Sequence, residues 1–451
     1  MRITTGLTSQ RTNWQVLRAA LGVAGWAIAG LVVVGSTAAH AQDWPQWRGT
    51  NRDGKATGFK APESWPKELK QQWKIEVGDG VATPSLVGDK LYVFTRQEGK
   101  EIIRCLNAAT GEELWQDKYD AEAVRGAASG FSGPRSSPTV AAGKVIAFGA
   151  QGTLSCYAAD MGKLLWRNDD FRGDVPRFAV SSSPIVLEGL CIIQYGDERD
   201  GGVIAYDLES GKEKWKWAGN GPAYGSPVLM TVDGVQAIIT PTADKMVALG
   251  VADGKLLWEI PYTQGRYNAA TPIVSGKTLI YAGPNKGTTA VKIAKQGADL
   301  GSEALWANPD NSVQFNTPVV RDGLVYGISG LNSLFCVNAD DGVTVWTAPL
   351  GMKSPDESKK AEEPKKEEDT GKGRRRGRGM GRDGYGSVVD AGSILVALTP
   401  SGEMTVFEPG KEFKQLATYK VASEGTYAYP VLSGKRLFIK DKDSIALLTT
   451  Q

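Results

Sequence analysis

The sequence predicts an all-β protein: an eight-bladed β-propeller built from four-stranded antiparallel blades. Three observations support this prediction. A motif recurs along most of the 451 residues. The 55 glycines give a turn-rich composition, and short apolar runs lie between the start and the end of each copy of the motif. Such a pattern is typical of many short strands joined by tight turns. A regular repeat of this kind indicates a ring of similar sheets rather than two or three unrelated domains.

Each copy of the repeat begins with Thr-Pro or Ser-Pro and ends with Gly-x-x-x-Trp. Six copies are clear, and they begin at Thr83, Ser137, Ser183, Ser226, Thr271 and Thr317. A seventh is degenerate, with Ser387-Val388 at its start and Leu416 where Trp is expected, and an eighth begins at Tyr429-Pro430 and has only three strands. Successive prolines lie roughly 43–54 residues apart, which matches one four-stranded blade. We therefore expect eight blades, with seven as the alternative.

The fourth strand of the eighth copy is predicted at the other end of the chain. Residues 69–77 contain Trp73, the tryptophan of a fourth strand, without three strands before it. Pairing this strand with the C-terminal strands would close the ring and leave no open blade. The repeat tryptophans are expected to cover the surfaces between stacked blades. They are Trp73, Trp115, Trp166, Trp215, Trp258, Trp306 and Trp346.

The first 41 residues are predicted to be a cleavable secretory signal peptide. They combine a basic start, an apolar stretch over residues 17–35 and small residues around His40. An uncleaved membrane anchor is the alternative. No cysteine lies next to the cleavage site, so we do not expect a lipoprotein. The propeller, residues 42–451, is therefore expected in the periplasm or outside the cell, with no transmembrane segment after cleavage.

Residues 353–383 interrupt the repeat between the sixth and seventh copies. They consist largely of Lys, Arg, Asp and Glu and contain almost no apolar residue. A segment of this composition cannot bury enough surface to order itself, so we predict a disordered charged insertion. A tether for an anionic partner is the alternative to a simple solvated insertion.

Charge balance and histidine content exclude several classes of function. The chain has 52 Lys and Arg against 50 Asp and Glu, which gives no reason to expect a specific nucleic-acid partner. Its one histidine, His40, lies in the predicted signal peptide. The mature chain then lacks an imidazole for general-base catalysis, for a Ser-His-Asp triad or for a zinc site.

The four cysteines are predicted to be buried free thiols. Cys105, Cys156 and Cys336 occupy the same place in three repeats, whereas Cys191 lies in a second strand. Equivalent positions in different blades should be too far apart for a disulfide, whose Cα atoms lie within about 7 Å of each other.

The end of the repeat resembles a motif of a known family. Ala108-Ala109-Thr110-Gly111 followed by Trp115, and Asp341-Gly342 followed by Trp346, resemble the tryptophan-docking motif of PQQ-like propellers. That family includes quinoprotein alcohol dehydrogenases and BamB-like exported proteins, which are non-enzymatic assembly factors of outer-membrane β-barrels. The segment from Trp44 to Gly54, with Trp47, Arg48 and Arg52, resembles the start of many exported propellers. We expect this segment to wrap the outside of the ring.

Resemblance to quinoprotein dehydrogenases implies a PQQ cofactor over an axial tryptophan, under a vicinal disulfide and beside calcium and a catalytic Asp. The sequence has no adjacent cysteine pair and no haem-attachment motif. The repeat, the signal region and the segment before the first copy account for every tryptophan except Trp217, which shares a strand face with Trp215. We therefore expect no axial tryptophan and no bound PQQ or calcium. The acidic loop Asp197–Gly202 lacks the spacing of a calcium loop, so a solvated turn is favoured there.

The loops that lead into the first strands are predicted to gather at one end of the channel and to form a partner face. They carry aromatic, basic or amide side chains shortly before the proline position. These residues are Arg135, Arg177, Phe178, Tyr224, Arg266, Tyr267, Asn268, Phe315, Asn316, Tyr385 and Tyr427. Tyr and Arg around a funnel suit a protein or carbohydrate interface, and simple packing between neighbouring loops is the alternative.

Together, these observations favour an exported, monomeric, non-catalytic scaffold that binds a protein or an envelope polymer through its axial face. A PQQ-dependent quinoprotein oxidoreductase with a divergent site is the alternative. A sugar-acting enzyme with paired carboxylates is a third interpretation, but no sequence feature identifies such a pair.

Overall fold

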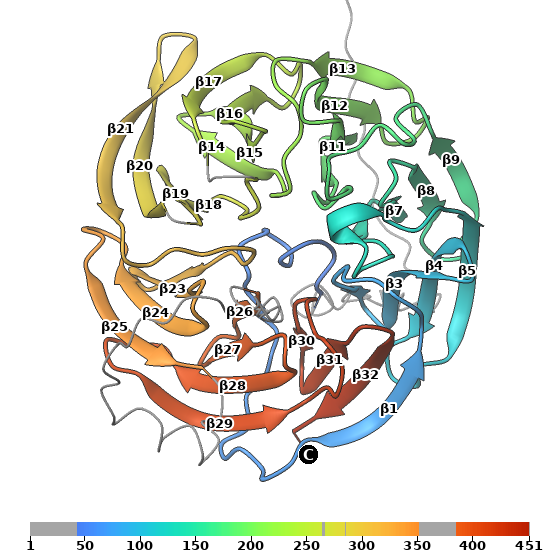
Figure 1. Cartoon of the computed structure of the whole chain (residues 1–451), viewed down its shortest axis with the longest axis vertical. Helices are drawn as coiled ribbons and strands as arrows, with labels where there is room; N and C mark the ends of the chain where they lie inside the picture. The colour runs from blue at the N-terminus through green and yellow to red at the C-terminus, as the bar shows by residue number, and fades with distance from the viewer. Residues whose placement is uncertain (1–42, 264–266, 285, 351–384, 451) are drawn as a thin grey trace, which may run out of the picture. The chain divides into compact units, whose positions relative to one another are not determined.

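The computed structural model describes residues 43–263, 267–284, 286–350 and 385–450. Eight four-stranded antiparallel sheets follow one another around a central axis (Figure 1). The predicted eight-bladed propeller is therefore confirmed. The predicted signal peptide (1–41) and charged insertion (353–383) lie outside the described residues. Within the described ranges, no helix combines the length and the apolar character needed to cross a membrane.

Blades one to four are formed from consecutive strands, with the first strand nearest the axis and the fourth at the rim (Figure 1). Blade one consists of β2 (Ser85–Val87), β3 (Lys90–Gln97), β4 (Lys100–Asn107) and β5 (Glu113–Asp120). Blade two consists of β6 (Thr139–Ala141), β7 (Lys144–Phe148), β8 (Leu154–Ala158) and β9 (Leu164–Asn168). Blade three consists of β10 (Ile185–Leu187), β11 (Leu190–Gly196), β12 (Gly201–Asp207) and β13 (Glu213–Trp217). Blade four consists of β14 (Val228–Val232), β15 (Val235–Pro241), β16 (Lys245–Gly250) and β17 (Leu256–Pro261).

Blades five to seven follow the same order. Blade five consists of β18 (Ile273–Ser275), β19 (Thr278–Gly283), β20 (Gly287–Gln296) and β21 (Asp299–Asn308). Blade six consists of β22 (Val319–Arg321), β23 (Leu324–Ile328), β24 (Ser333–Asn338) and β25 (Thr344–Pro349). Blade seven consists of β26 (Ser387–Asp390), β27 (Leu395–Leu398), β28 (Glu403–Glu408) and β29 (Lys414–Lys420).

The ring closes by pairing strands from opposite ends of the described chain. Blade eight combines β30 (Val431–Ser433), β31 (Arg436–Lys440) and β32 (Ser444–Thr449) with β1 (Lys70–Glu76). β1 runs antiparallel to β32, and its Trp73 lies opposite Leu447. The predicted closure by an N-terminal strand is therefore confirmed.

Five repeat tryptophans cover the motif glycine of the following blade: Trp73, Trp115, Trp166, Trp215 and Trp306. The indole N–H of Trp115 donates a 3.2 Å hydrogen bond to the carbonyl of Ala159 in blade two. Its ring covers Gly162, where a Cβ would lie 2.4 Å from the indole. Trp215 covers Gly254 of blade four in the same way. Glycine is needed at these positions because a side chain would collide with the ring and because the backbone φ is positive.

Every fourth strand has a β-bulge next to its docking position. In blade one the register shifts at Leu114, between Glu113 and Trp115, and in blade eight it shifts at Gln72. The same shift occurs in the other six blades. A bulge re-aims the side chains that follow it and interrupts an exposed strand edge. Here it turns the docking side chain toward the next blade.

All four cysteines are buried free thiols, as predicted. Burial raises the pKa of the Cys105 thiol to about 11 and that of the Cys156 thiol to about 12. These thiols therefore stay protonated and pack as small apolar groups.

A closed chain of hydrogen bonds runs around the axis at the start of the blades. The backbone N–H of one motif Ser or Thr donates to the hydroxyl of the next at distances from 2.9 to 3.1 Å, in the order Thr83, Ser137, Ser183, Ser226, Thr271 and Thr317. Tyr429 closes the chain. Its phenol accepts from the Thr317 N–H at 3.2 Å, and its own N–H donates to Thr83 Oγ1 at 3.0 Å.

Candidate binding funnel at the propeller axis

Residues 44–60, here called the axial segment, cross the central channel (Figure 1). The expectation that this part of the chain wraps the outside of the ring is wrong. Its backbone pairs with the first strands, with Trp44 bridging Leu86 of blade one and Lys55 bridging Asp390 of blade seven. The innermost strand of a blade leaves one edge unpaired toward the channel, and the axial segment satisfies polar groups on that edge. It also contacts Val140, Pro184, Pro227, Thr271, Thr317 and Gly434, so it touches all eight blades.

Two buried arginines of the axial segment reach opposite parts of the ring. Arg48 is fully buried and donates to the carbonyl of Thr317 in blade six at 2.7 Å and to the phenol of Tyr429 in blade eight at 3.2 Å. Arg52 donates to the carbonyl of Pro227 in blade four at 2.7 Å. Both arginines have φ near +60°, in the left-handed region, and this allows tight turns within the channel. Burial lowers the pKa of Arg52 to about 9, so the guanidinium remains a cation at neutral pH.

A tryptophan of the axial segment lies inside the ring of first strands. The indole N–H of Trp47 donates to Thr271 Oγ1 of blade five at 3.0 Å. Its ring packs edge-on against Tyr429 of blade eight, with centroids 4.8 Å apart. The expectation that no tryptophan is left for the axis is therefore wrong. It failed because Trp47 belongs to a segment that the sequence placed outside the ring.

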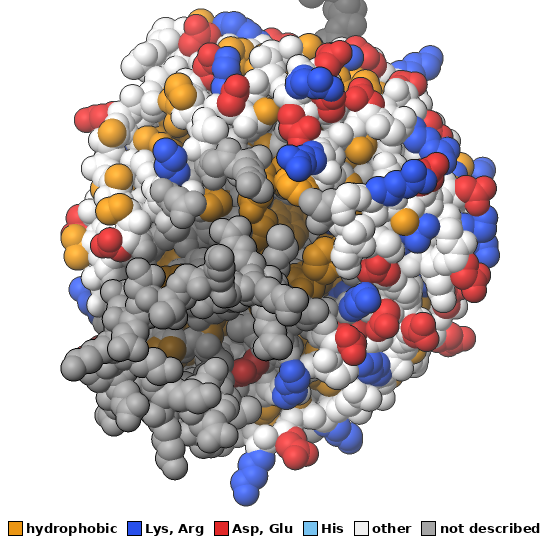
Figure 2. Space-filling model, in the orientation of Figure 1, with side chains coloured by type: hydrophobic (Ala, Val, Ile, Leu, Met, Phe, Trp, Pro, Cys, Tyr) orange, Lys and Arg blue, Asp and Glu red, His pale blue; other side chains and the backbone are white. Residues whose placement is uncertain are grey.

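Seven aromatic rings, here called the collar, lie at the end of the channel where the first strands begin. Neighbouring rings have centroids 4.0–6.2 Å apart, and Phe315 stacks on Tyr385 at the shortest of these distances. All seven side chains are half-buried. The collar consists of Phe131, Tyr427, Tyr385, Phe315, Tyr267, Phe178 and Tyr224. Figure 2 shows hydrophobic side chains around the hollow at the centre of the viewed face.

Six collar residues belong to the face that the sequence predicted, and the structure brings them together. Phe131 is the exception. It lies in the long loop before blade two, next to the 3-10 turn η2 (Gly126–Ala128), and its ring contacts Tyr427 with centroids 4.6 Å apart. Phe131 precedes Pro138 by the same seven positions that separate Arg177 from Pro184, so its place in the repeat was a signal that could have predicted it.

Two of the predicted face residues lie behind the collar. Asn268 is buried, and its side-chain amide donates to the carbonyls of Thr242 and Tyr262 at 2.7 Å each. Asn316 is also buried and donates to the carbonyl of Ile328 at 2.8 Å. These amides hold the loops that carry the collar, so they shape the funnel without lining it. Arg266 lies outside the described residues.

One carboxylate organises the edge of the collar between blades three and four. Glu198 Oε1 accepts from the Tyr224 hydroxyl at 2.8 Å and from the backbone N–H of Arg177 at 2.8 Å. The exposed guanidinium of Arg177 lies 5.5 Å from the centroid of the Phe178 ring. Burial, with the hydrogen bond to Glu198 as the next cause, raises the pKa of Tyr224 well above its usual value. The phenol is therefore a neutral donor with a fixed direction.

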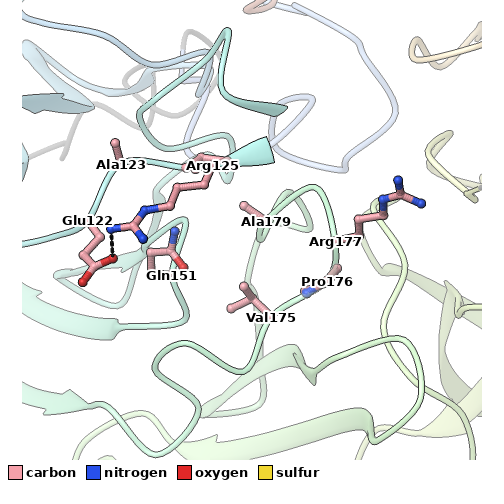
Figure 3. Close-up of a pocket in the computed structure, with 9 residues that line it drawn as sticks. Glu122, Ala123, Arg125, Gln151, Val175, Pro176, Arg177 and Ala179 are labelled. Atoms are coloured by element: carbon pink, nitrogen blue, oxygen red, sulfur yellow. Dashed lines mark ion pairs between the residues drawn. The ribbon is translucent and has the colours of Figure 1, made fainter. Parts of the chain in front are cut away.

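A cavity of about 290 Å³ lies beside the funnel, between the loops before blades two and three (Figure 3). Glu122 and Arg125 form an exposed ion pair at 3.0 Å on one side of it. Figure 3 shows the Arg177 side chain pointing away from that pair. The cationic groups around this cavity thus do not converge on one point. Among the residues that the structure describes, no three His, Cys, Asp or Glu side chains gather closely enough to hold a metal ion.

A protein-family model described as outer membrane protein assembly factor BamB matches residues 99–348, more than half of the chain. The chain belongs to this family. Curated relatives are BamB of Burkholderia pseudomallei, 28% identical over 43% of this chain and 46% of the relative, and a quinohemoprotein alcohol dehydrogenase of Comamonas testosteroni, 29% identical over 34% of this chain and 22% of the relative. The alignments thus span less than half the length of both relatives.

Solved structures of a BamB protein and of a quinohemoprotein alcohol dehydrogenase share the fold of this chain. BamB from Moraxella catarrhalis superposes with a TM-score of 0.58 over 84% of this chain and 97% of that chain, at 13% identity. Quinohemoprotein alcohol dehydrogenase from Comamonas testosteroni superposes with a TM-score of 0.63 over 92% of this chain and 81% of that chain, at 15% identity. At such identities the likeness concerns the fold alone, so function has to be argued from the funnel.

Proposed function

We propose that this protein is an exported, non-catalytic scaffold that binds a protein or an envelope polymer through the collar. The observation that carries the proposal is the arrangement along the channel. The axial segment fills the channel between the first strands, from Asp390 and Gly434 up to the motif residues Thr271 and Thr317, and the aromatic collar lies on the loops that precede the motif residues. Clustered half-buried Tyr and Phe rings are suited to anchoring a macromolecular partner, because they bury a large area at a small cost in side-chain entropy.

The funnel does not fit the site of a PQQ-dependent oxidoreductase. That site combines an axial tryptophan with a vicinal disulfide, calcium and a catalytic Asp. Trp47 supplies an axial ring, which is the one observation in favour of this alternative. The four cysteines are separate free thiols, and the described residues lack a three-residue cluster with metal-ligating chemistry. The proposal therefore includes no cofactor and no metal.

The signal-peptide pattern of residues 1–41 supports export, and the names of the BamB relatives associate that family with the outer membrane. We therefore propose that the scaffold acts in the periplasm or outside the cell.

Site-specific photo-crosslinking tests the proposal. A photoreactive phenylalanine analogue replaces Tyr427 in the collar and, as a matched control, Leu165 on the exposed rim of β9. We expect a discrete adduct in the native envelope from position 427 and none from position 165. Identical adduct patterns at both positions would remove the collar as the partner face. Stoichiometric binding of PQQ with calcium, together with dye-linked alcohol oxidation, would replace the scaffold function by the oxidoreductase.

A further inference from the structure

Arg135 lies in the loop that leads into blade two, which also carries Phe131 of the collar. Its guanidinium donates to the carbonyls of Ala128 at 3.0 Å, Phe131 at 2.8 Å and Gly133 at 3.3 Å. These bonds fix the side chain against its own loop. They also fix Phe131, whose ring belongs to the collar, so the cation and the aromatic surface are built as one unit.

The guanidinium has hydrogen-bonding capacity that the described residues do not use. An arginine carries five N–H donors, and the three bonds to carbonyls leave its Nε–H and one Nη1–H without an acceptor in the described part of the chain. No carboxylate there lies within ion-pair distance of Arg135. By contrast, Arg167 pairs with Asp117 at 2.9 Å and Arg321 with Asp390 at 2.7 Å.

The charge of Arg135 interacts with the phenol of Tyr385 in the collar. Burial lowers the pKa of Arg135 to about 10, and Asp79 and Tyr385 are the next causes, with opposite sign. Burial also raises the pKa of Tyr385 to about 12, and the Arg135 charge opposes that rise. The group is therefore a cation at neutral pH, partly removed from water, that faces neutral phenols.

We infer that Arg135 receives a carboxylate of the partner, and that the partner presents an acidic peptide segment in which the carboxylate is flanked by aromatic or aliphatic side chains. This inference rests on the proposed function and specifies its chemistry. A carboxylate matches the fork geometry of a guanidinium, and the exchange of water for a charge-assisted bond is most favourable where the cation is already partly desolvated. The flanking apolar side chains would pack on the collar rings.

A peptide fits this funnel better than a polyanion does. Nucleic acids and other polyphosphates need several cations that follow their backbone. Around the collar, the Glu198 carboxylate lies against Tyr224, and the Asp79 carboxylate accepts from the Ser132 N–H at 2.7 Å. These two acids would repel additional negative charges. A single carboxylate is compensated by the charge of Arg135, whereas further negative charges would meet no second half-buried cation on the described loops that carry the collar.

Fluorescence anisotropy with two labelled peptides tests the inference on the mature full chain. Both peptides have Gly and Ser flanks, and they differ only in a central Phe-Glu-Phe or Phe-Gln-Phe. We expect the Glu peptide to bind at least about tenfold more tightly, because a hydrogen bond to a charged group contributes about 1.5–3 kcal/mol. Arg135→Gln should abolish this preference, Arg135→Lys should keep part of it, and Arg125→Gln, in the exposed part of the same loop, should leave it unchanged.

Each other outcome overturns the inference. If Arg135→Lys loses the preference as completely as Arg135→Gln, the arginine only holds its loop. If both peptides bind equally and Tyr427→Ser weakens both, the collar binds partners without a carboxylate contact, and the proposed function survives. If neither peptide binds, the inference fails while the crosslinking comparison decides the partner face separately. Tighter, Arg135-dependent binding of a single-stranded oligonucleotide would assign the site to a polyanion.

Discussion

The phenol of Tyr429 spans blade seven and accepts a hydrogen bond from the backbone N–H of Thr317 in blade six. The two residues are neighbours in the hydrogen-bonded chain around the axis, although their blades are not adjacent. Blade seven carries Ser387 at its motif position, but the buried Ser387 hydroxyl has no hydrogen-bond partner among the described residues, which leaves a gap in the chain. The long side chain of Tyr429, at the Ser-Pro position of blade eight, compensates for that gap.

Tyr429→Phe should destabilise the propeller by about 1–3 kcal/mol, because it leaves the buried N–H of Thr317 without its acceptor and also removes one acceptor of Arg48. Urea unfolding measures this difference. Tyr281→Phe is the matched control, since Tyr281 is half-buried and its hydroxyl makes no hydrogen bond with the described residues. Equal losses in the two variants would show that the phenol of Tyr429 has no special role.

Arg52→Met should cost about 2–4 kcal/mol of unfolding free energy. The substitution keeps the apolar stem but leaves the carbonyls of Pro184 and Pro227 without a donor in the channel, and each unsatisfied buried group costs about 1–3 kcal/mol. Thermal unfolding of Arg125→Met, at an exposed position, provides the control. A stable Arg52→Met variant would mean that the cost of burying the cation outweighs its hydrogen bonds.

Gly254→Ala and Gly276→Ala separate the two reasons why glycine is needed, which are a positive φ and the close approach of an indole ring. Both positions have positive φ, +69° and +60°, so both variants pay the backbone cost. At Gly254 the new Cβ would also lie 2.4 Å from the Trp215 ring, whereas at Gly276 nothing lies within 4 Å. We expect Gly254→Ala to be less stable by a further 1–3 kcal/mol, roughly the cost of overpacking. Chemical denaturation of both variants under one set of conditions decides this, and equal stabilities would contradict the docking role of the glycine.

Lys440, in the blade that closes the ring, should make the free energy of unfolding depend on pH in the alkaline range. Its ammonium is buried and donates to the carbonyls of Gly80 at 3.1 Å and Asp441 at 2.7 Å. Burial lowers the pKa of Lys440 from 10.5 to about 8. Between these values the unfolded chain binds more protons than the folded chain, so the free energy of unfolding should rise with pH, by at most about 1.4 kcal/mol per unit.

Urea unfolding of the wild type and of Lys440→Met at pH 8 and pH 9.5 measures that contribution. The wild type should gain stability relative to the variant over this interval, because the other titrating groups are common to both. A parallel pH dependence of the two proteins would exclude Lys440 as the source.

The repeat motif made the propeller predictable. Ser-Pro and Thr-Pro mark the start of a first strand, and Gly-x-x-x-Trp marks the approach to a fourth strand, because each residue type has a local geometric role. The isolated Trp73 then predicted ring closure. The collar followed from the same periodicity, since an aromatic residue at one phase of a repeat must appear at one height of the ring, as Phe315 and Tyr385 do.

The axial segment could not be predicted in this way. Trp47, Arg48 and Arg52 lie outside the repeat. No periodicity therefore predicts how far from the propeller axis they lie, or at which level along it. Their contacts are with residues far along the chain, such as Thr271 and Thr317. A buried arginine that bonds to carbonyl and phenol oxygens also has no acidic partner in the sequence to reveal it. Arg135 was found because it precedes Pro138 closely, but its unpaired donors became visible only in the structure.

Unfolding should be all-or-none because of the axial segment. In a ring whose blades touch only their neighbours, stability is close to a sum of pairwise terms, and single blades can open in turn. Here seventeen residues near the start of the described chain join every blade to a common centre, so the loss of any blade also removes backbone pairs or side-chain hydrogen bonds of this segment. The stabilities of blades on opposite sides of the ring are thereby coupled through the axial segment, although these blades do not contact each other. A partly assembled ring cannot satisfy the two central guanidinium groups, and this disfavours intermediates with missing blades.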